Sequence, residues 1–472
     1  MSFPLVIQGG MGAGVSSWML AKSVSSYGQL GVVSGTALDV SLLRLLQLGD
    51  KDGHIRRALS HFPVPEIAER ILSKYFIEGG KSEKEPFKTS SMFTIKPGKS
   101  LLELNIVSNF VEVFLAKEGH NNPVGINYLE KIQMPNLSAI YGAMLAGVDY
   151  ILMGAGIPRE IPGILDKLTK HEEVTYKINV LGATSGDDFK AIFNPKEILE
   201  KVLPELERPK FLAIIASAIL ALTLSKKATG KVDGFIVEGP TAGGHNAPPR
   251  GLMQLDDIGE PIYGEKDEVD LVKIKELGYP FWLAGSFGKP EKVAEALNLG
   301  ATGVQVGSLF AFCEESGFAK EYKKATIEKV LHGKATVFTD PLASPTGFPF
   351  KVVKLENTVS EDEDYKKRNR ICDLGYLRHI YRKEDGTVGY RCPSEPVDQY
   401  VKKGGKIEDT ENRKCLCNAL VSNIGLAQIQ SDGYVEQGLV TAGDEVNEIK
   451  KLIKPGKDTY TAADVLDYLL GK

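Results

Sequence analysis

The sequence predicts an α/β protein that folds as a (β/α)8 TIM barrel, with a helical insertion after the second strand and a C-terminal extension. Eight short apolar runs recur along the chain, and helical patterns follow most of them. Apolar strands that alternate with helices indicate a parallel sheet, and eight such units fit a closed barrel better than an open sheet. The chain has 472 residues, which exceeds one ordinary core and leaves room for additions.

The predicted strands end in glycine or in small polar residues. In a barrel the segments that follow the strands lie together on one face, so these glycine-rich ends should converge on one site. The strands are expected at Leu5–Gln8, Leu30–Ser34, Val124–Asn127, Tyr150–Met153, Phe211–Ala216, Phe235–Glu238, Phe281–Ala284 and Val304–Val306.

The segments that do not follow this repeat define the domain organisation. We predict that residues 1–38 and 123–339 form the barrel, with a small insertion at about 171–209. Residues 39–122 should form a mostly helical insertion, and residues 340–472 a C-terminal extension.

The charge balance argues against binding to nucleic acid or to an anionic membrane. The chain carries 57 basic and 61 acidic residues, a formal net charge of −4, and so has no strong field of one sign. The N-terminus has no basic segment followed by a long apolar stretch, so we expect no signal peptide. The most apolar later run, Phe211–Leu224, is short for a bilayer span. We therefore expect a cytoplasmic protein.

The five cysteines do not resemble a disulfide framework. They are Cys313, Cys372, Cys392, Cys415 and Cys417, an odd number, and four of them lie in the last quarter of the chain. Four thiolates could bind zinc, but one C-x-C pair with two distant single cysteines is not the paired spacing typical of zinc sites. We expect buried free thiols and no metal.

Two strand ends predict a phosphate site. The seventh and eighth predicted strands end in Gly285-Ser286 and Gly307-Ser308, each before a helical pattern. Glycine lets the backbone approach a phosphate closely, and a helix N-terminus offers free N–H groups to an anion. One such turn would indicate only a tight connection, but phosphate sites after strands seven and eight recur in this barrel.

A histidine that follows two glycines is the candidate catalytic residue. Gly243, Gly244 and His245 lie in the loop that follows the sixth predicted strand, where the catalytic side chains of a barrel belong. Histidine is well suited to proton transfer near neutral pH. A third motif, Val6–Gly14, could place backbone N–H groups against a planar cofactor, and its spacing is not a Rossmann fingerprint.

These motifs together resemble the nitronate monooxygenase (2-nitropropane dioxygenase-like) family and its FMN-dependent enoyl-ACP reductase relatives. The resemblance covers most of residues 4–36, 123–154 and 211–312, and it is most specific in TAGGH and in AGSFG with GVQVGS. The family usually has glutamate where this chain has Thr241. In its length the chain resembles a long branch of this family, which includes the enoyl reductases of polyunsaturated fatty acid synthases.

The resemblance implies FMN as the cofactor and assigns roles to individual residues. His245 matches the catalytic histidine, Asn127 the asparagine that touches FMN, and Glu238 the position beside the flavin. The cofactor-binding residues that it implies are Gln8, Gly9, Gly10, Met11, Asn127, Glu238, Gly243, Gly244, Gly285, Ser286, Gln305, Val306, Gly307 and Ser308.

The function that these expectations favour is the oxidation of alkyl nitronates with O2 by an FMN-dependent nitronate monooxygenase. The alternative is an NAD(P)H-dependent FMN enoyl-thioester reductase, which could take its substrate from an acyl carrier protein. A third hypothesis is a flavin-binding scaffold without catalysis, against which His245 and both phosphate loops count. A homodimer is compatible with each of these.

The segment Ser344–Lys351, with the sequence SPTGFPFK, supports two interpretations. It could be a turn-rich strap across the barrel mouth, or a linker between the barrel and the extension.

Overall fold

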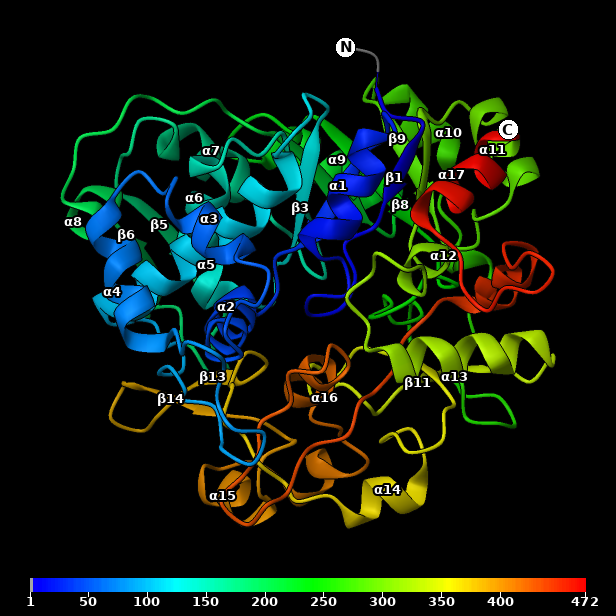
Figure 1. The fold of residues 1–472 in the computed structure, drawn as a ribbon. Coiled ribbons are helices and arrows are strands. Elements are labelled where there is room, and N and C mark those ends of the chain that lie inside the picture. Colours follow the sequence, from blue (N-terminus) through cyan, green and yellow to red (C-terminus); the bar gives the residue numbers. More distant parts are fainter. Residues whose placement is uncertain (1–2) are drawn as a thin grey trace.

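The computed structural model describes residues 3–472 and contains a closed parallel barrel (Figure 1). The eight strands pair in the order β1-β10-β9-β8-β7-β4-β3-β2, and a parallel bridge between Ile7 and Leu30 brings the two ends of the sheet together. This closure confirms the predicted (β/α)8 TIM-barrel fold. The first two residues of the predicted segment 1–38 lie outside the described residues. The barrel strands are β1 (Val6–Gln8), β2 (Gly31–Ser34), β3 (Val124–Leu129), β4 (Tyr150–Gly154), β7 (Lys210–Ile215), β8 (Gly234–Glu238), β9 (Phe281–Ala284) and β10 (Gly303–Val306).

Large apolar side chains fill the inside of the barrel. Ile7, Val32, Leu152, Ile236 and Trp282 belong to one buried cluster contributed by strands around the whole sheet. The barrel is therefore a packed core and not a pore, so that a site for a ligand has to lie at the ends of the strands.

Helices surround the strands and follow the alternation that the sequence predicts. Connections of this kind bury both faces of a parallel sheet, which is why its strands are almost continuously apolar. The helices between the barrel strands, apart from those of the insertions, are α1 (Trp18–Ser26), α6 (Gln133–Leu145), α7 (Ile161–Leu168), α9 (Ala218–Lys227), α10 (Leu271–Glu276) and α11 (Pro290–Asn298); α12 (Ser308–Ala311) and α13 (Lys320–Leu331) follow β10, and a short 3₁₀ turn η1 (Glu265–Asp267) precedes α10.

The segment between β2 and β3 is helical, and its last helix belongs to the ring around the barrel. This helix, α5 (Lys99–Lys117), packs against α1 and α6. The preceding helices α2 (Leu38–Gln47), α3 (His54–Leu59) and α4 (Pro65–Tyr75) pack against α5. The segment thus contains the expected crossover helix as well as added helices.

A smaller addition separates α7 from β7. It forms an antiparallel hairpin of β5 (Val174–Lys177) and β6 (Lys190–Phe193), followed by the short helix α8 (Pro195–Leu199). Exposed and buried residues alternate along both strands, as expected for a hairpin with one covered face.

The C-terminal part forms a lobe beside the barrel and then returns to it. In Figure 1 the yellow-to-orange segment lies below the barrel, whereas the red helix α17 (Ala462–Leu470) lies next to α11. Since α17 packs against α1 and α11, the end of the chain fills the last place in the helical ring. The other elements are β11 (Val337–Asp340), β12 (Phe350–Val353), α14 (Asp362–Lys367), β13 (His379–Arg382), β14 (Val388–Arg391), α15 (Val397–Lys402), α16 (Leu416–Ser422) and the 3₁₀ turns η2 (Ile407–Thr410) and η3 (Asp444–Lys451).

Within residues 3–472, none of the helices combines the length and the apolar character needed to cross a bilayer.

Candidate functional site

A cavity of about 550 Å³ lies at the carboxyl ends of the barrel strands. This volume falls in the range of small-molecule and cofactor sites. Its walls come from loops that follow strands all around the barrel, as the convergence of the strand ends predicts. The predicted site residues that line it are Gly9, Gly10, Met11, Asn127, Glu238, Gly243, Gly244, His245, Gly285, Ser286, Gln305, Gly307 and Ser308.

Two predicted cofactor residues, Gln8 and Val306, do not line the cavity. Both are buried in the barrel wall. The Gln8 amide donates to Ser16 Oγ at 2.9 Å, and its carbonyl oxygen accepts from Val32 N at 3.0 Å. Gln8 therefore braces the loop after β1, and its hydrogen-bonding groups are already used by the protein.

One end of the cavity offers unsatisfied carboxamide groups beside a glycine pair. The side-chain oxygens of Asn127 and Gln305 are buried and accept no hydrogen bond from the described residues. A Cβ on Gly10 would lie 2.4 Å from Asn127 Cβ, so only glycine allows this close approach. Buried polar atoms normally have partners. This end is thus suited to a flat heteroaromatic ring with polar edges.

The loops after β9 and β10 form the other end. Gly285 and Ser286 both have positive φ, 94° and 59°, and this left-handed conformation is uncommon for serine. The backbone N–H groups of Ser286 and Phe287 donate no hydrogen bond within residues 3–472. Free amides in such a loop form a concave site for an anion. The geometry therefore fits a phosphate group where the sequence predicts one.

A carboxyl group from the C-terminal part lies at this same end, and sequence reasoning missed it. Glu445 lines the cavity, and its Oε2 accepts a hydrogen bond from Gly288 N at 2.7 Å. Burial raises the pKa of Glu445 to about 6. No local pattern in the sequence connects Glu445 with a loop more than 150 residues earlier.

The segment that carries Glu445 is hydrogen-bonded to two of the predicted glycine loops, the one at Gly307-Ser308 and the one at Gly243-Gly244. Gly443 N donates to Ser308 Oγ at 2.8 Å, and Gly244 N donates to Thr441 Oγ1 at 3.0 Å. A Cβ on Gly243 would lie 2.8 Å from Gly443 N. The C-terminal part thus completes the wall of the cavity beside the loops after β9 and β10.

His245 lies on the cavity wall as a neutral imidazole. Burial, with a smaller effect of the nearby Lys131 ammonium, lowers the pKa of His245 to about 3. Its Nε2 lies 2.7 Å from Ser344 Oγ, and its ring packs edge-on against Phe350. A histidine with so low a pKa is a weak base, and at neutral pH it can donate or accept one hydrogen bond without carrying charge.

Glu238 brings a second titratable group to the cavity. It is the last residue of β8, and burial raises its pKa to about 7. A carboxyl group with this pKa exchanges its proton near neutral pH, which is the property of a general acid or base. The pKa of Glu238 therefore suits proton transfer near neutral pH better than the low pKa of His245 does.

The segment Ser344–Lys351 crosses the mouth of the cavity, as the strap interpretation expects. Lys351 N donates to Gly244 O at 2.9 Å, and Asn246 N donates to Pro349 O at 3.0 Å. Phe348 and Phe350 of this strap line the cavity. A bridge between His245 and Phe350 fixes the histidine loop against the strap.

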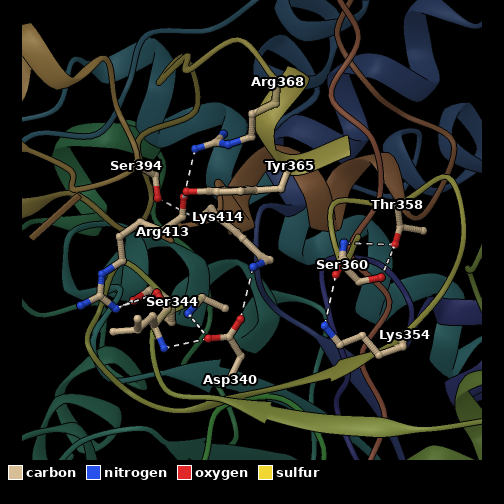
Figure 2. A network of polar contacts seen from close by, with 12 residues as sticks. Asp340, Ser344, Lys354, Thr358, Ser360, Tyr365, Arg368, Ser394, Arg413 and Lys414 are labelled. Carbon is tan, nitrogen blue, oxygen red and sulfur yellow. Dashed lines mark hydrogen bonds and ion pairs between the residues drawn. The ribbon is translucent and has the colours of Figure 1, made fainter. Parts of the chain in front are cut away.

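The start of the strap is held by charged residues of the C-terminal lobe (Figure 2). Arg413 donates to Ser344 O at 2.6 Å, and Lys414 Nζ lies 3.2 Å from Asp340 Oδ2. Asp340 Oδ1 in turn accepts from Ala343 N at 2.9 Å. These contacts fix the strap before it reaches the barrel mouth.

The lobe also supplies an apolar wall of the cavity that the sequence did not reveal. The residues of this wall come from the segment before β13 and from α16, where the sequence shows no barrel motif. They are Tyr376, Leu377, Leu416, Cys417 and Leu420.

The fold and the site together define a class: a TIM barrel with a cofactor-sized cavity at the carboxyl ends of its strands, glycine-rich loops after β9 and β10, and titratable side chains on the cavity wall. The family model for nitronate monooxygenase matches residues 192–353. This stretch contains the histidine loop, the phosphate loops and the strap. The match confirms the resemblance predicted from the sequence, and the chain is an oxidoreductase enzyme.

Similarity to solved structures is distant. FabK from Thermotoga maritima is 15% identical with a TM-score of 0.47, covering 99% of this chain and 92% of that chain. Nitroalkane oxidase from Streptomyces ansochromogenes is 15% identical with a TM-score of 0.43, covering 99% and 95%. The enoyl reductase domain of MlnA from the macrolactin biosynthesis cluster of Bacillus amyloliquefaciens is 12% identical with a TM-score of 0.45, covering 99% and 93%. The search of curated proteins gave no match.

Proposed function

We propose that the protein is an FMN-dependent nitronate monooxygenase that oxidises alkyl nitronates with O2. The observation that carries the proposal is the pair of unsatisfied carboxamide oxygens of Asn127 and Gln305, which share one cavity with His245 and the phosphate loops. A flavin ring offers an N–H group to such oxygens. The matched family model supports the same chemistry.

The cavity favours FMN over a dinucleotide cofactor. It has one cradle for a phosphate, at Ser286 and Phe287, and the glycines after β1 lack the Rossmann spacing. A single terminal phosphate therefore satisfies the free amides. Gly9 and Gly10 would lie along the ring, with Asn127 and Gln305 at its polar edge.

FMN held by these residues would supply the redox chemistry between the substrate and O2, and the protein would bind and orient the reactants. The neutral imidazole of His245 can donate a hydrogen bond to an oxygen of the nitronate. Glu238, with its pKa raised to about 7, can hold or release a proton in the same cavity. Phe348 and Phe350 of the strap line this space and would limit the access of water to it.

One observation favours a second candidate, the NAD(P)H-dependent reduction of an enoyl thioester. The wall that the C-terminal lobe adds is mostly apolar, through Leu377, Leu416 and Leu420. Such a wall suits the hydrocarbon chain of an acyl group better than it suits a small nitronate.

Anaerobic mixing of the flavin-loaded protein separates the candidates. If the proposal holds, an alkyl nitronate alone bleaches the flavin absorbance and NADPH alone does not. Bleaching by NADPH, with reoxidation by an enoyl thioester, would replace the oxygenase with the reductase. A flavin that neither compound bleaches would leave only a binding role.

The size of the cavity supports a small-molecule substrate. The cellular location, the oligomeric state and any macromolecular partner stay predictions. We propose a cytoplasmic enzyme without nucleic-acid partners, and a homodimer is testable by size-exclusion chromatography with light scattering. An acyl carrier protein would be required only by the second candidate.

A further inference from the structure

We propose that Ser344 and Thr346 of the strap are positioning residues that fix the tautomer of His245, so that its Nδ1–H faces an anionic substrate. The inference rests on the proposed function and adds to it two residues from the C-terminal part of the chain. Neither Ser344 nor Thr346 lines the catalytic cavity, so both act through the histidine.

A chain of hydrogen bonds runs from the imidazole into the strap. Nε2 of His245 lies 2.7 Å from Ser344 Oγ, which in turn lies 2.8 Å from Thr346 Oγ1. A hydroxyl group both donates and accepts, so each contact can run in either direction. Because Ser344 has one hydroxyl proton, the two directions are linked: if Ser344 donates to His245, Thr346 has to donate to Ser344.

The centre of this chain is shielded from water. Ser344 is fully buried, whereas Thr346 is partly exposed. Buried polar groups normally find their partners within the protein, and the partners within reach of the Ser344 hydroxyl group are His245 and Thr346. The strap therefore determines what the Nε2 atom of the histidine meets.

The backbone of the strap is held on both sides of Thr346. Arg413 donates to Ser344 O at 2.6 Å, before Thr346 (Figure 2). Asn246 N donates to Pro349 O at 3.0 Å, after it. Since Asn246 follows His245 directly, the histidine loop and the strap are fixed to each other, and the hydroxyl groups are already in place before a substrate binds.

The backbone amide of Thr346 favours donation by Ser344. Thr346 N donates to Ser344 Oγ at 3.2 Å, so one acceptor position of this oxygen is taken. When Thr346 Oγ1 donates as well, both acceptor positions are taken, and Ser344 can only donate to Nε2. The single proton of the neutral imidazole then lies on Nδ1.

Nδ1 is the ring nitrogen that is left for a molecule in the cavity. His245 lines the cavity, and of its two ring nitrogens only Nε2 has a hydrogen-bond partner among residues 3–472. The direction of the Ser344 hydroxyl group thus decides whether the histidine offers the cavity an N–H group or a lone pair.

The tautomer matters because His245 stays uncharged. Burial lowers the pKa of His245 to about 3, with a smaller effect of the Lys131 ammonium, so an imidazolium with two N–H groups is unfavourable at neutral pH. A nitronate oxygen accepts hydrogen bonds and donates none. It is bound by the tautomer with Nδ1–H and repelled by the lone pair of the other. Ser344 thereby contributes to substrate specificity from outside the cavity.

The lobe contains a second hydroxyl pair with the same spacing, which serves as the matched control. Thr358 Oγ1 and Ser360 Oγ lie 2.8 Å apart, and both donate to Leu355 O (Figure 2). Neither of the two lines the cavity. Loss of the Ser360 hydroxyl group tests the structural cost of removing such a group without touching the histidine.

The first measurement reads the tautomer without any turnover. Full-length protein is labelled with ¹⁵N at histidine, and the His245 signals are assigned by their absence from His245→Gln. We expect the proton on Nδ1 in the wild type and in Ser360→Ala. In Ser344→Ala we expect it on Nε2, because this nitrogen then has no donor from which to accept. The same tautomer in the wild type and in Ser344→Ala would overturn the proposal.

The second measurement is kcat/KM with an alkyl nitronate. Thr346→Val keeps the shape of the side chain and removes its hydroxyl group, and Thr346→Ser keeps the hydroxyl group. We expect kcat/KM to fall about 10-fold in Ser344→Ala and in Thr346→Val, the usual effect of losing a hydrogen bond to a charged group. Thr346→Ser and Ser360→Ala should match the wild type.

The outcomes separate this inference from the proposed function. Wild-type kcat/KM in both Ser344→Ala and Thr346→Val would overturn the role of the strap hydroxyl groups, although nitronate oxidation would stand. A wild-type protein that does not oxidise nitronates would refute the proposed function, and the tautomer in Ser344→Ala would still decide whether Ser344 positions the histidine.

Discussion

At the scale of single residues, the cavity contains polar groups whose usual charge is suppressed by burial. The pKa of His245 is lowered to about 3 and that of Glu238 is raised to about 7. Both shifts have the same first cause, because a low-dielectric surrounding favours the neutral form of any group. We propose that the neutral histidine serves in hydrogen bonding and that the carboxyl group, with its pKa of about 7, serves in proton transfer.

We predict that His245→Ala retains FMN and loses about 10²–10⁴-fold in turnover, the usual effect of removing a positioned polar catalytic group. The substitution leaves the backbone of Gly243 and Gly244 and the other expected cofactor contacts in place, so flavin content should not change. The measurement is kcat/KM with a nitronate, with His332→Ala as the control, since His332 is an exposed histidine directly after α13. Near-normal kcat/KM in His245→Ala would remove this residue from the reaction.

The carboxyl group of Glu445 should weaken phosphate binding where it is ionised. Its pKa is raised to about 6, so it is largely charged above that pH, and like charges repel in a partly desolvated site. Glu445→Gln keeps an acceptor for Gly288 N. We predict that this variant binds FMN about 10-fold more tightly at pH 8, on the order of 1.4 kcal/mol.

Fluorescence quenching of FMN by apoprotein at pH 5.5 and pH 8 measures the effect of Glu445→Gln. The advantage of the variant should shrink at pH 5.5, because wild-type Glu445 is then mostly protonated. Equal dissociation constants for the two proteins at pH 8 would place the phosphate away from Glu445.

At the scale of elements, helix α5 connects the insertion to the barrel through one buried carboxyl group. Glu112 on α5 accepts a hydrogen bond from Trp18 N at 3.0 Å, at the start of α1. Helix N-termini favour a negative group, yet burial raises the pKa of Glu112 to about 7. The desolvation of the carboxylate therefore outweighs the attraction of the helix end.

The raised pKa gives Glu112→Gln a defined pH dependence. The folded protein favours protonated Glu112, so this contribution to stability is complete below about pH 4.5 and is lost as the pH rises through about 7. Glutamine keeps the acceptor without the charge. We predict that the variant is more stable at pH 8, by roughly 3 kcal/mol at most, and equal to wild type near pH 4.5.

Urea unfolding at several pH values tests this prediction, and Glu118→Gln at the end of the same helix is the matched control. Arg57 lowers the pKa of Glu118, so its contribution is present above its unfolded pKa and is lost as the pH falls. Glu118→Gln should therefore be less stable than wild type at pH 8. The same pH dependence for both variants would refute the assignment for Glu112.

The elements also show what local sequence can predict. The eight strands were predictable because buried parallel strands are short, almost continuously apolar and followed by glycine, as in Phe281–Ala284 before Gly285. The places of α5 and α17 in the helical ring were not, because a helical pattern does not specify the partner of its apolar face. The walls supplied by Tyr376 and Glu445 depend on contacts across hundreds of residues, which leave no local signal.

At the scale of the whole molecule, the C-terminal part completes the barrel in two places. Helix α17 closes the ring between α11 and α1, and Tyr460 just before it donates from its hydroxyl group to Leu309 O at 2.7 Å. The chain from the strap to the start of η3 covers the mouth of the cavity through the strap, α16 and the segment Thr441–Glu445. The barrel and the extension thus form one catalytic unit.

The central claim is that this cavity binds FMN, with its ring near Asn127 and Gln305 and its phosphate near Ser286 and Phe287. The most direct measurement is chromatographic identification of the flavin released when the purified protein is denatured. We predict FMN, about one per chain, and its loss from a folded Gly307→Asp variant, whose carboxylate would enter the phosphate end of the cavity. Release of FAD, or full FMN content in Gly307→Asp, would contradict this account.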